Sequence, residues 1–133
     1  MVQHFVIQLP NRPGELAHLA RALAARGINI VHVAAGGAGS EAFAYLETDR
    51  FDDTREVLSG MGYDYLAGKT IVVECRDEPG ALAGLAEELA AVGVNIEGVM
   101  TASHAGGKVD VALTVDDVDK ARAALDRDKV VAA

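Results

Sequence analysis

Hydrophobic positions along this chain follow two spacings in turn, and the succession then occurs a second time. Every second residue from Phe5 to Leu9 is hydrophobic, which is typical of one face of a half-buried strand. Leu16, Leu19 and Leu23 follow at the i, i+3 and i+7 spacing of one helix face. The second occurrence comprises Ile71, Val73 and Cys75, and then Leu82, Leu85 and Leu89. Each half is therefore expected to hold a strand and then a helix with a buried leucine stripe.

A constant offset of 66 residues relates the two halves. Pro13 to Ile30 and Pro79 to Ile96 carry the same residue at twelve of eighteen positions. A match at a fixed period indicates a duplicated module, and we place the modules at residues 1–67 and 68–133. Units of this size bury only about 60% of their unfolded surface, so we expect the modules to pack together. Only Ala67-Gly68 is predicted to link them.

The other elements of each module are predicted from turn and capping residues. Pro13 and Pro79 mark the starts of the first helices, and Gly27 and Gly93 mark their ends. Glycine-rich turns at residues 36–40 and 106–107 separate the middle strands. The second strand of each module is expected at residues 29–34 and 95–102. The third is expected at 43–48 and 109–115, and the closing strand at 63–66 and 129–132.

The second helices are expected to begin at Asp52-Asp53 and at Asp116-Asp117, because carboxylates favour the N-terminal end of a helix. The offset between these pairs is 64, which predicts a hairpin two residues shorter in the second module. The predicted order is βαββαβ, twice. The right-handed crossover rule then favours an α+β fold of two tandem ferredoxin-like modules packed together, with the helices on one side of the sheet or sheets.

The acidic balance of the chain disfavours several classes of partner. The formal net charge is −8, whereas nucleic acids and anionic membranes attract basic patches. No apolar run reaches the roughly 18 residues of a spanning helix, and the single Cys75 has no internal disulfide partner. We expect a cytoplasmic protein that binds no nucleic acid and no membrane. Apolar residues at outward strand positions also predict self-association, as a homodimer: Val6, Val31, Val33, Val72 and Val99.

The loop between the first strand and the first helix is the candidate binding region. It reads Asn11-Arg12-Pro13-Gly14 in the first module and Asp77-Glu78-Pro79-Gly80 in the second. Asn11 and Asp77 can simply cap the helix that follows. Alternatively, the helix amides bind a carboxylate while Asn11 or Asp77 accepts a hydrogen bond from an ammonium group, which together suit a small zwitterion. The sequence leaves both roles open.

Both halves of the chain resemble the ACT domain in the order of their motifs. Each half has a strand, then Asp/Asn-x-Pro-Gly-x-Leu, then a leucine-striped helix, and then Gly-Ile/Val-Asn-Ile. The resemblance implies an amino-acid-binding regulatory protein with no catalytic activity of its own, which acts on a metabolic enzyme in trans. It is similar to small proteins made only of two tandem ACT modules. No cofactor or metal ion is expected. In that family the ligand usually lies between paired modules, touched by the loop of one and the second strand of the other.

The resemblance assigns ligand contacts to equivalent positions in the two modules. The loop positions are Asn11, Arg12, Pro13, Gly14, Glu15 and Leu16, and Asp77, Glu78, Pro79, Gly80, Ala81 and Leu82. The strand positions are Asn29, Ile30, Asn95 and Ile96. The loops differ in charge, since Asp77-Glu78 suits an ammonium and Asn11-Arg12 suits a carboxylate better. The two pockets therefore differ in preference, or only one of them binds.

The histidines show no metal-ligand spacing, although His4 and His32 can meet across neighbouring strands. An alternative function on the same fold is an acylphosphatase-like hydrolase, in which Arg12 and a nearby Asn would bind phosphate. Glu78 replaces that arginine in the second module. An RNA-binding module is a third possibility and ranks last, because Glu41 and Glu47 flank the aromatic Phe43 and Tyr45.

Overall fold

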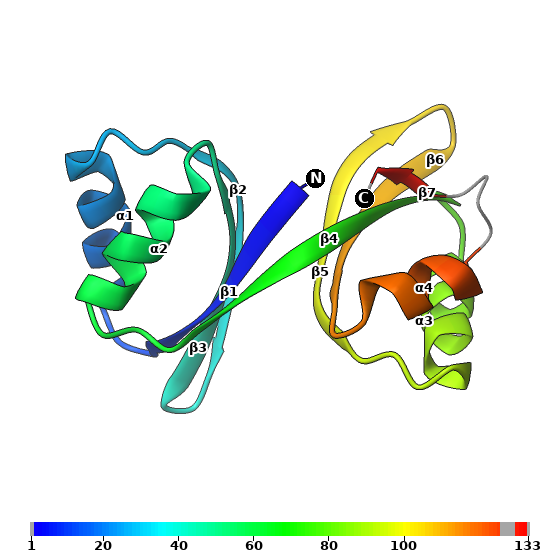
Figure 1. The fold of residues 1–133 in the computed structure, drawn as a ribbon, viewed down its shortest axis with the longest axis horizontal. Helices are drawn as coiled ribbons and strands as arrows, with labels where there is room; N and C mark the ends of the chain where they lie inside the picture. The colour runs from blue at the N-terminus through cyan, green and yellow to red at the C-terminus, as the bar shows by residue number, and fades with distance from the viewer. Residues whose placement is uncertain (1, 126–129, 133) are drawn as a thin grey trace. The chain divides into compact units, whose positions relative to one another are not determined.

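The structure, a computed structural model, describes residues 2–125 and 130–132. Lys129, which begins the last predicted strand, lies outside the described residues, as do the chain ends Met1 and Ala133. The described chain divides into two compact units, and Figure 1 shows that each combines strands with helices. One unit is Gln3–Ala67, and the other is Gly68–Ala133 together with Met1–Val2.

The unit Gln3–Ala67 has the predicted βαββαβ order. Its elements are β1 (Val2–Pro10), α1 (Glu15–Ala25), β2 (Ile30–Ala38), β3 (Glu41–Thr48), α2 (Phe51–Gly60) and the start of β4 (Tyr65–Arg76). The strand order is β2-β3-β1-β4, and β3 pairs antiparallel with β1 and with β2. Phe5, Ile7 and Leu9 of β1 pack against Leu19 and Leu23 of α1 in one buried core.

The second unit repeats this order. It continues β4 and adds α3 (Ala81–Ala91), β5 (Ile96–Ala105), β6 (Lys108–Val115), α4 (Val118–Ala124) and β7 (Val130–Ala132). The strand order is β4-β6-β5, and β7 pairs with β4. Ile71 and Val73 of β4 share a core with Leu85 and Leu89 of α3. The α+β class and the two ferredoxin-like modules are confirmed.

The predicted link at Ala67-Gly68 is wrong, because both residues lie inside the continuous strand β4. Gly68 is a strand residue whose lack of a side chain matters. A Cβ built there would lie 2.3 Å from Cγ2 of Thr114, a fully buried residue of β6. A glycine in mid-strand often marks such a close approach, and it was mistaken for a linker signal.

The predicted offset of 64 after the hairpin is also wrong. Asp49 N–H donates to Asn29 O at 3.1 Å, and Asp116 N–H donates to Asn95 O at 3.1 Å. Equivalent residues there lie 67 apart (116−49), so the second module is one residue longer. The extra residue is absorbed by a register shift between Thr101 and Ser103 of β5. A β-bulge of this kind inserts one residue without changing the turn, and both hairpins keep two-residue loops.

The helix ends match the predicted glycine caps. Gly27 and Gly93 have φ of 68° and 75°. Ile28 N–H donates to Leu23 O at 3.0 Å, and Val94 N–H donates to Leu89 O at 3.0 Å. These bonds close Schellman motifs, which need a left-handed residue just after the helix. Each helix therefore stops at the point where the second strand must begin.

Two of the predicted burial assignments are wrong. Leu16 and Leu82 were expected in the core, but they are 49% and 50% exposed, at the first turn of α1 and α3. Val33 and Val99 were expected on the outward face of the sheet, yet they pair with the core residues Leu46 and Leu113. They share the helix-covered face with those residues and are exposed because β2 and β5 are edge strands. No helix among the described residues is long and apolar enough to cross a membrane.

Candidate ligand-binding site

The loop before each first helix turns through a glycine with a positive φ. Gly14 and Gly80 are the N-cap residues of α1 and α3, with φ of 87° and 88°, a conformation that favours glycine. The helices therefore begin at Glu15 and Ala81, two residues after the prolines that were predicted to start them. The first amide of each helix donates to the preceding loop, from Glu15 N–H to Arg12 O at 3.4 Å and from Ala81 N–H to Glu78 O at 3.3 Å. The amides that follow have no acceptor within the helix, as at any helix N-terminus.

Asn11 does not cap α1, and its side chain joins the loop to the β2–β3 hairpin instead. Its Nδ2 donates to Gly39 O at 3.0 Å, and its backbone N–H donates to Ser40 O at 3.0 Å. A Cβ on Gly37 would lie 2.7 Å from Asn11 Cγ and Oδ1. The carboxamide thus lies directly on the Gly37 backbone, and it keeps one oxygen that can still accept a hydrogen bond.

Asp77 makes the equivalent contact in the second unit with a different partner. Its backbone N–H donates to Gly107 O at 2.8 Å, and its Oδ2 lies 3.2 Å from Nδ1 of His104. Both side chains are more than half exposed. The capping role for Asn11 and Asp77 is therefore wrong in both copies, since neither helix has a side-chain cap at this end. The loop residue is tied to the tip of the middle hairpin instead.

Arg12 is engaged by the residue that begins α1. Its Nε donates to Glu15 Oε1 at 2.6 Å, and the Tyr63 hydroxyl donates to Glu15 Oε2 at 3.1 Å. The hydrogen bond from Arg12 holds the pKa of Glu15 below its usual range. Burial and the hydrogen bond to Glu15 raise the pKa of Tyr63. The guanidinium predicted to suit a ligand carboxylate already has a carboxylate partner within the protein.

Each unit has a cavity beside its loop, at equivalent positions. The first has a volume of about 560 Å³ and is lined by Gln8, Arg12, Glu15, His18 and Tyr63, among others. The second, of about 480 Å³, is lined by Glu74, Glu78, Ala81, Gly84 and Leu85, among others. The residues at 8, 12, 15 and 18 correspond to 74, 78, 81 and 84 at the offset of 66. Both volumes fall in the range of small-molecule sites, roughly 300 to 1,000 Å³.

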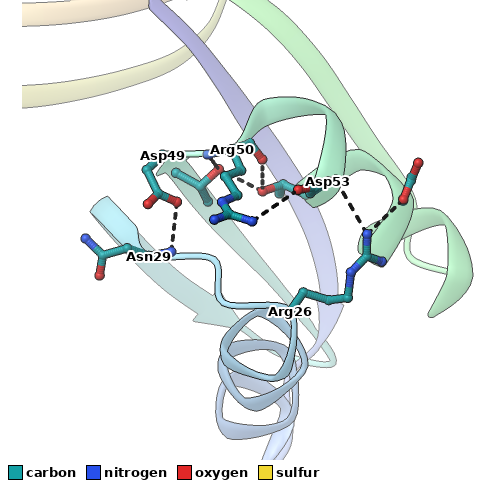
Figure 2. Close-up of polar contacts among 8 residues, drawn as sticks. Arg26, Asn29, Asp49, Arg50 and Asp53 are labelled. Carbon is teal, nitrogen blue, oxygen red and sulfur yellow. Dashed lines mark hydrogen bonds and ion pairs between the residues drawn. The ribbon is translucent and has the colours of Figure 1, made fainter.

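Asn29 and Asn95 lie at the other end of the first helices and meet an aspartate. Asn29 N–H donates to Asp49 Oδ1 at 2.9 Å, and Asn95 N–H donates to Asp116 Oδ1 at 2.9 Å. Figure 2 shows the Asn29 carboxamide turned away from Asp49. Both asparagines are exposed, whereas Ile30 and Ile96 pack against the cores. The backbone of each asparagine is thus held in place, and neither carboxamide forms a hydrogen bond within the part of the chain that the structure describes.

Within one unit the structure does not bring the loop and strand positions together. The 11 residues of α1 separate Asn29 from the loop, and α3 does the same for Asn95. An 11-residue helix is about 16 Å long. A ligand that touches both groups would have to lie between two modules, which stays a prediction.

Ion pairs next to Asn29 fix the start of α2 (Figure 2). Arg26 Nη2 lies 2.9 Å from Glu56 Oε2 and 3.5 Å from Asp53 Oδ1, and Arg50 Nη1 lies 3.7 Å from Asp53 Oδ2. All of these side chains are partly exposed, so each pair stabilises the fold only modestly. They join α1 to α2 and leave the Asn29 carboxamide outside the network.

Sequence reasoning missed the role of Glu47. Its Oε2 lies 2.6 Å from His32 Nδ1 and 3.2 Å from His4 Nε2, so the two histidines meet through this carboxylate on the intervening strand β3. His4 is 2% exposed and stacks on Tyr45 with ring centroids 4.7 Å apart. Burial lowers the pKa of His4, although Glu47 opposes the shift. The alternation of residues 43 to 47 was the signal that could have placed Glu47 beside His4.

Tyr45 is buried, with 7% of its surface exposed. It is therefore not available to stack on an RNA base, as one of the two aromatic rings of an RNA-binding surface would have to do. Among residues 2–125 and 130–132 no group of three or more His, Cys, Asp or Glu side chains is arranged to hold a metal ion.

Comparison with known families shows to which family the chain with this repeated loop belongs. The sequence matches the ACT domain family model twice, over residues 4–57 and 69–132. The chain belongs to the ACT domain family. ACT domains are regulatory ligand-binding modules, and this chain holds two of them in tandem.

Solved structures with the same fold cover nearly the whole chain. Protein BT0572 from Bacteroides thetaiotaomicron superposes with a TM-score of 0.72 at 22% identity, over 97% of this chain and 89% of that one. The regulatory subunit of aspartate kinase from Thermus thermophilus superposes with a TM-score of 0.60 at 23% identity, over 93% of this chain and 87% of that one. The corresponding subunit from Thermus flavus superposes with a TM-score of 0.63 at 21% identity, over 93% of this chain and 91% of that one. These likenesses support the fold. No curated protein matches the chain.

Proposed function

We propose that this tandem ACT protein binds a free amino acid and regulates a metabolic enzyme in trans, with no catalytic activity of its own. The observation that carries the proposal is the pair of family matches, each with a Pro-Gly loop beside a cavity. Solved neighbours of similar length are regulatory subunits of aspartate kinase, which supports a regulatory role in trans. The fold alone hosts many functions, so the proposal rests on the family and on the loop.

The loop and strand residues suit a zwitterion. At the helix N-terminus, the backbone amides and the helix dipole favour a carboxylate. Asn11 and Asp77 each keep an oxygen that can accept from an ammonium group. Asn29 and Asn95 present exposed carboxamides. We retain all sixteen predicted positions as the proposed ligand contacts, with the loop of one module and the strand start of another closing the pocket.

A homodimer is part of the proposal, because the exposed apolar residues recur at the same offset. Leu16 and Leu82 are about half exposed, and Val33 and Val99 are 48% and 41% exposed. Each pair sits 66 residues apart, so the same part of each module presents unburied leucine and valine. Exposed apolar patches of this kind mark sites of protein association. Val33 and Val99 lie on the edge strands β2 and β5, whose outer backbone groups are open to pairing with another chain.

The rival function, an acylphosphatase-like hydrolase, has less support. It needs Arg12 and a nearby asparagine to bind phosphate. Arg12 donates to Glu15, and Asn11 donates to Gly39 O. Both groups would have to give up these partners, and the acidic chain disfavours an anionic substrate.

A thermal-shift screen against the free amino acids tests the proposal. A ligand that binds only the folded state stabilises it by about 2.7 kcal/mol at a hundred times its Kd. We expect at least one amino acid to raise Tm in this way, and the variant Asn11→Ala/Asp77→Ala to lose the shift. If no amino acid raises Tm and phosphate is released from acetyl phosphate, the rival function replaces this one.

A further inference from the structure

The cavity of the second unit is apolar on the side formed by its helix, where the helix of the first unit presents polar side chains. Ala81, Gly84 and Leu85 of α3 line it together with Cys75 of β4. Leu85 is 5% exposed, so it forms the base of the cavity. At the positions of Ala81 and Gly84 the first unit has Glu15 and His18. Two polar side chains in one copy thus correspond to a methyl group and a hydrogen atom in the other.

Gly84 leaves space that a side chain could fill. A Cβ built on it meets no other heavy atom within 4 Å. Its φ is not positive, so the helix does not require glycine there. Glycine in a helix interior also costs roughly 1 kcal/mol relative to alanine. Glycine at this position therefore weakens α3, and the backbone conformation does not require it. Its effect is to keep the cavity open.

Charges of both signs surround this apolar side. Lys108 Nζ lies 3.0 Å from Glu74 Oε1. Arg76, Glu78 and Glu88 also line the cavity, and none of them forms an ion pair within the described chain. A guanidinium is suited to a carboxylate, and the two glutamates are suited to an ammonium. The chemistry complements a small molecule that carries a carboxylate, an ammonium and an apolar group.

We propose that the second unit binds a free amino acid with an apolar side chain in this cavity, and that Ala81 and Gly84 determine that specificity. The side chain lies on Cys75, Ala81, Gly84 and Leu85, the carboxylate lies at the start of α3 beside Arg76, and Glu78 adds an acceptor for the ammonium next to that of Asp77. The inference rests on the proposed function and names the copy and the ligand class. The first unit does not take the same ligand there, because Glu15 and His18 line its cavity.

Cys75 makes the occupancy of this cavity measurable. It is the single cysteine of the chain, it is not in a disulfide, and it is partly exposed. A maleimide or iodoacetamide that labels the protein therefore reports on this position alone. At a ligand concentration a hundred times Kd, labelling of the native full chain should slow by about a hundredfold, the factor 1 + [L]/Kd. Leucine, isoleucine, valine and phenylalanine are the probes, with aspartate and lysine for comparison.

Gly84→Phe and Gly84→Ala form the matched pair of variants. Both remove the helix glycine, but only phenylalanine fills the cavity. We expect Gly84→Phe to weaken ligand binding at least tenfold, which corresponds to about 1.4 kcal/mol. Gly84→Ala should bind within a few-fold of wild type, on the order of the effect of one methylene group. Ala81→Glu/Gly84→His, which installs the side chains of the first unit, should behave like Gly84→Phe.

The outcomes separate this inference from the proposed function. Protection of Cys75 by an apolar amino acid, lost in Gly84→Phe and kept in Gly84→Ala, supports the inference. An amino acid that raises Tm equally in wild type and Gly84→Phe without protecting Cys75 overturns it and leaves the proposed function standing. Protection by aspartate or lysine alone overturns the assigned ligand class. If no amino acid raises Tm or protects Cys75, the proposed function fails and this inference fails with it.

Discussion

At the scale of single residues, the contact between Asn11 and Gly37 gives the sharpest prediction. An alanine at Gly37 would push the Asn11 carboxamide aside and break its bond to Gly39 O. Gly37→Ala and Asn11→Ala should each lower the free energy of unfolding by about 1 kcal/mol, the value of one hydrogen bond. The double variant should cost little more than either single one. Urea unfolding of the four proteins measures the coupling, and simple additivity would show that the two residues do not touch.

His4 predicts how stability depends on pH. Burial lowers its pKa below the usual 6.5, so the folded protein holds it neutral where the unfolded chain would bind a proton. The resulting stability is fully present above about pH 6.5. It is lost as the pH falls from there through the folded pKa of His4, because the unfolded state binds more protons in that window.

His4→Gln should remove this part of the pH dependence. The free energy of unfolding, measured by urea titration at a series of pH values, should fall less steeply below pH 6.5 in the variant than in wild type. Above pH 7 the two curves should run parallel, which serves as the internal control. A wild-type curve that instead rises as the pH falls through this window would mean that Glu47 outweighs burial at His4.

The positions of the loop residues could be predicted from the sequence, but their contacts could not. Asn11 and Asp77 were correctly placed just ahead of a helix. Their partners, Gly39 and His104, lie on hairpins 28 and 27 residues away. Glu15, which the resemblance assigns to a ligand, also binds Arg12 and the distant Tyr63, and the bond to Tyr63 was not predicted. Local spacing carries no signal for such long-range contacts, and the glycines beside them resemble ordinary turn residues.

At the scale of elements, the continuous strand β4 predicts a strong effect at Gly68. Gly68→Ala should destabilise the protein by about 1 to 3 kcal/mol, as overpacking does, because Thr114 Cγ2 occupies the space of the new methyl group. Thr114→Ser removes that methyl and should restore part of the loss. If Gly68 were a flexible linker, alanine there would be neutral or slightly stabilising.

Strands and helices with a clear period were predicted well, and the irregular points between them were not. The leucine stripes placed α1 and α3, and the alternating residues placed β1 and the core half of β4. The register shift between Thr101 and Ser103 could not be seen in the sequence, because a bulge changes pairing without a distinctive residue. Leu16 and Leu82 fit the helical period, yet they lie on the first turn, beyond the edge of the sheet core. Periodicity predicts which face of a helix is apolar, but it does not predict how far along the helix the sheet covers that face.

At the scale of the whole molecule, the exposed leucines and valines predict self-association. Light scattering should give about twice the chain mass of 13.9 kDa at micromolar concentration. Val33→Lys/Val99→Lys should produce the monomer, because a charge on an edge strand blocks pairing with another chain. Both valines are more than 40% exposed in the single chain, so the variant should keep its circular dichroism spectrum. A wild-type mass of 13.9 kDa would contradict the proposed dimer.

Amino-acid binding is the central claim, and isothermal titration calorimetry of the full chain measures it most directly. Each free amino acid is titrated into the wild-type protein and into Asn11→Ala/Asp77→Ala. We expect saturable heat from at least one amino acid, with no more than two ligands per chain because the chain has two loops. The double variant should give no saturable heat while retaining a cooperative unfolding transition. The absence of saturable binding for every amino acid would contradict the account.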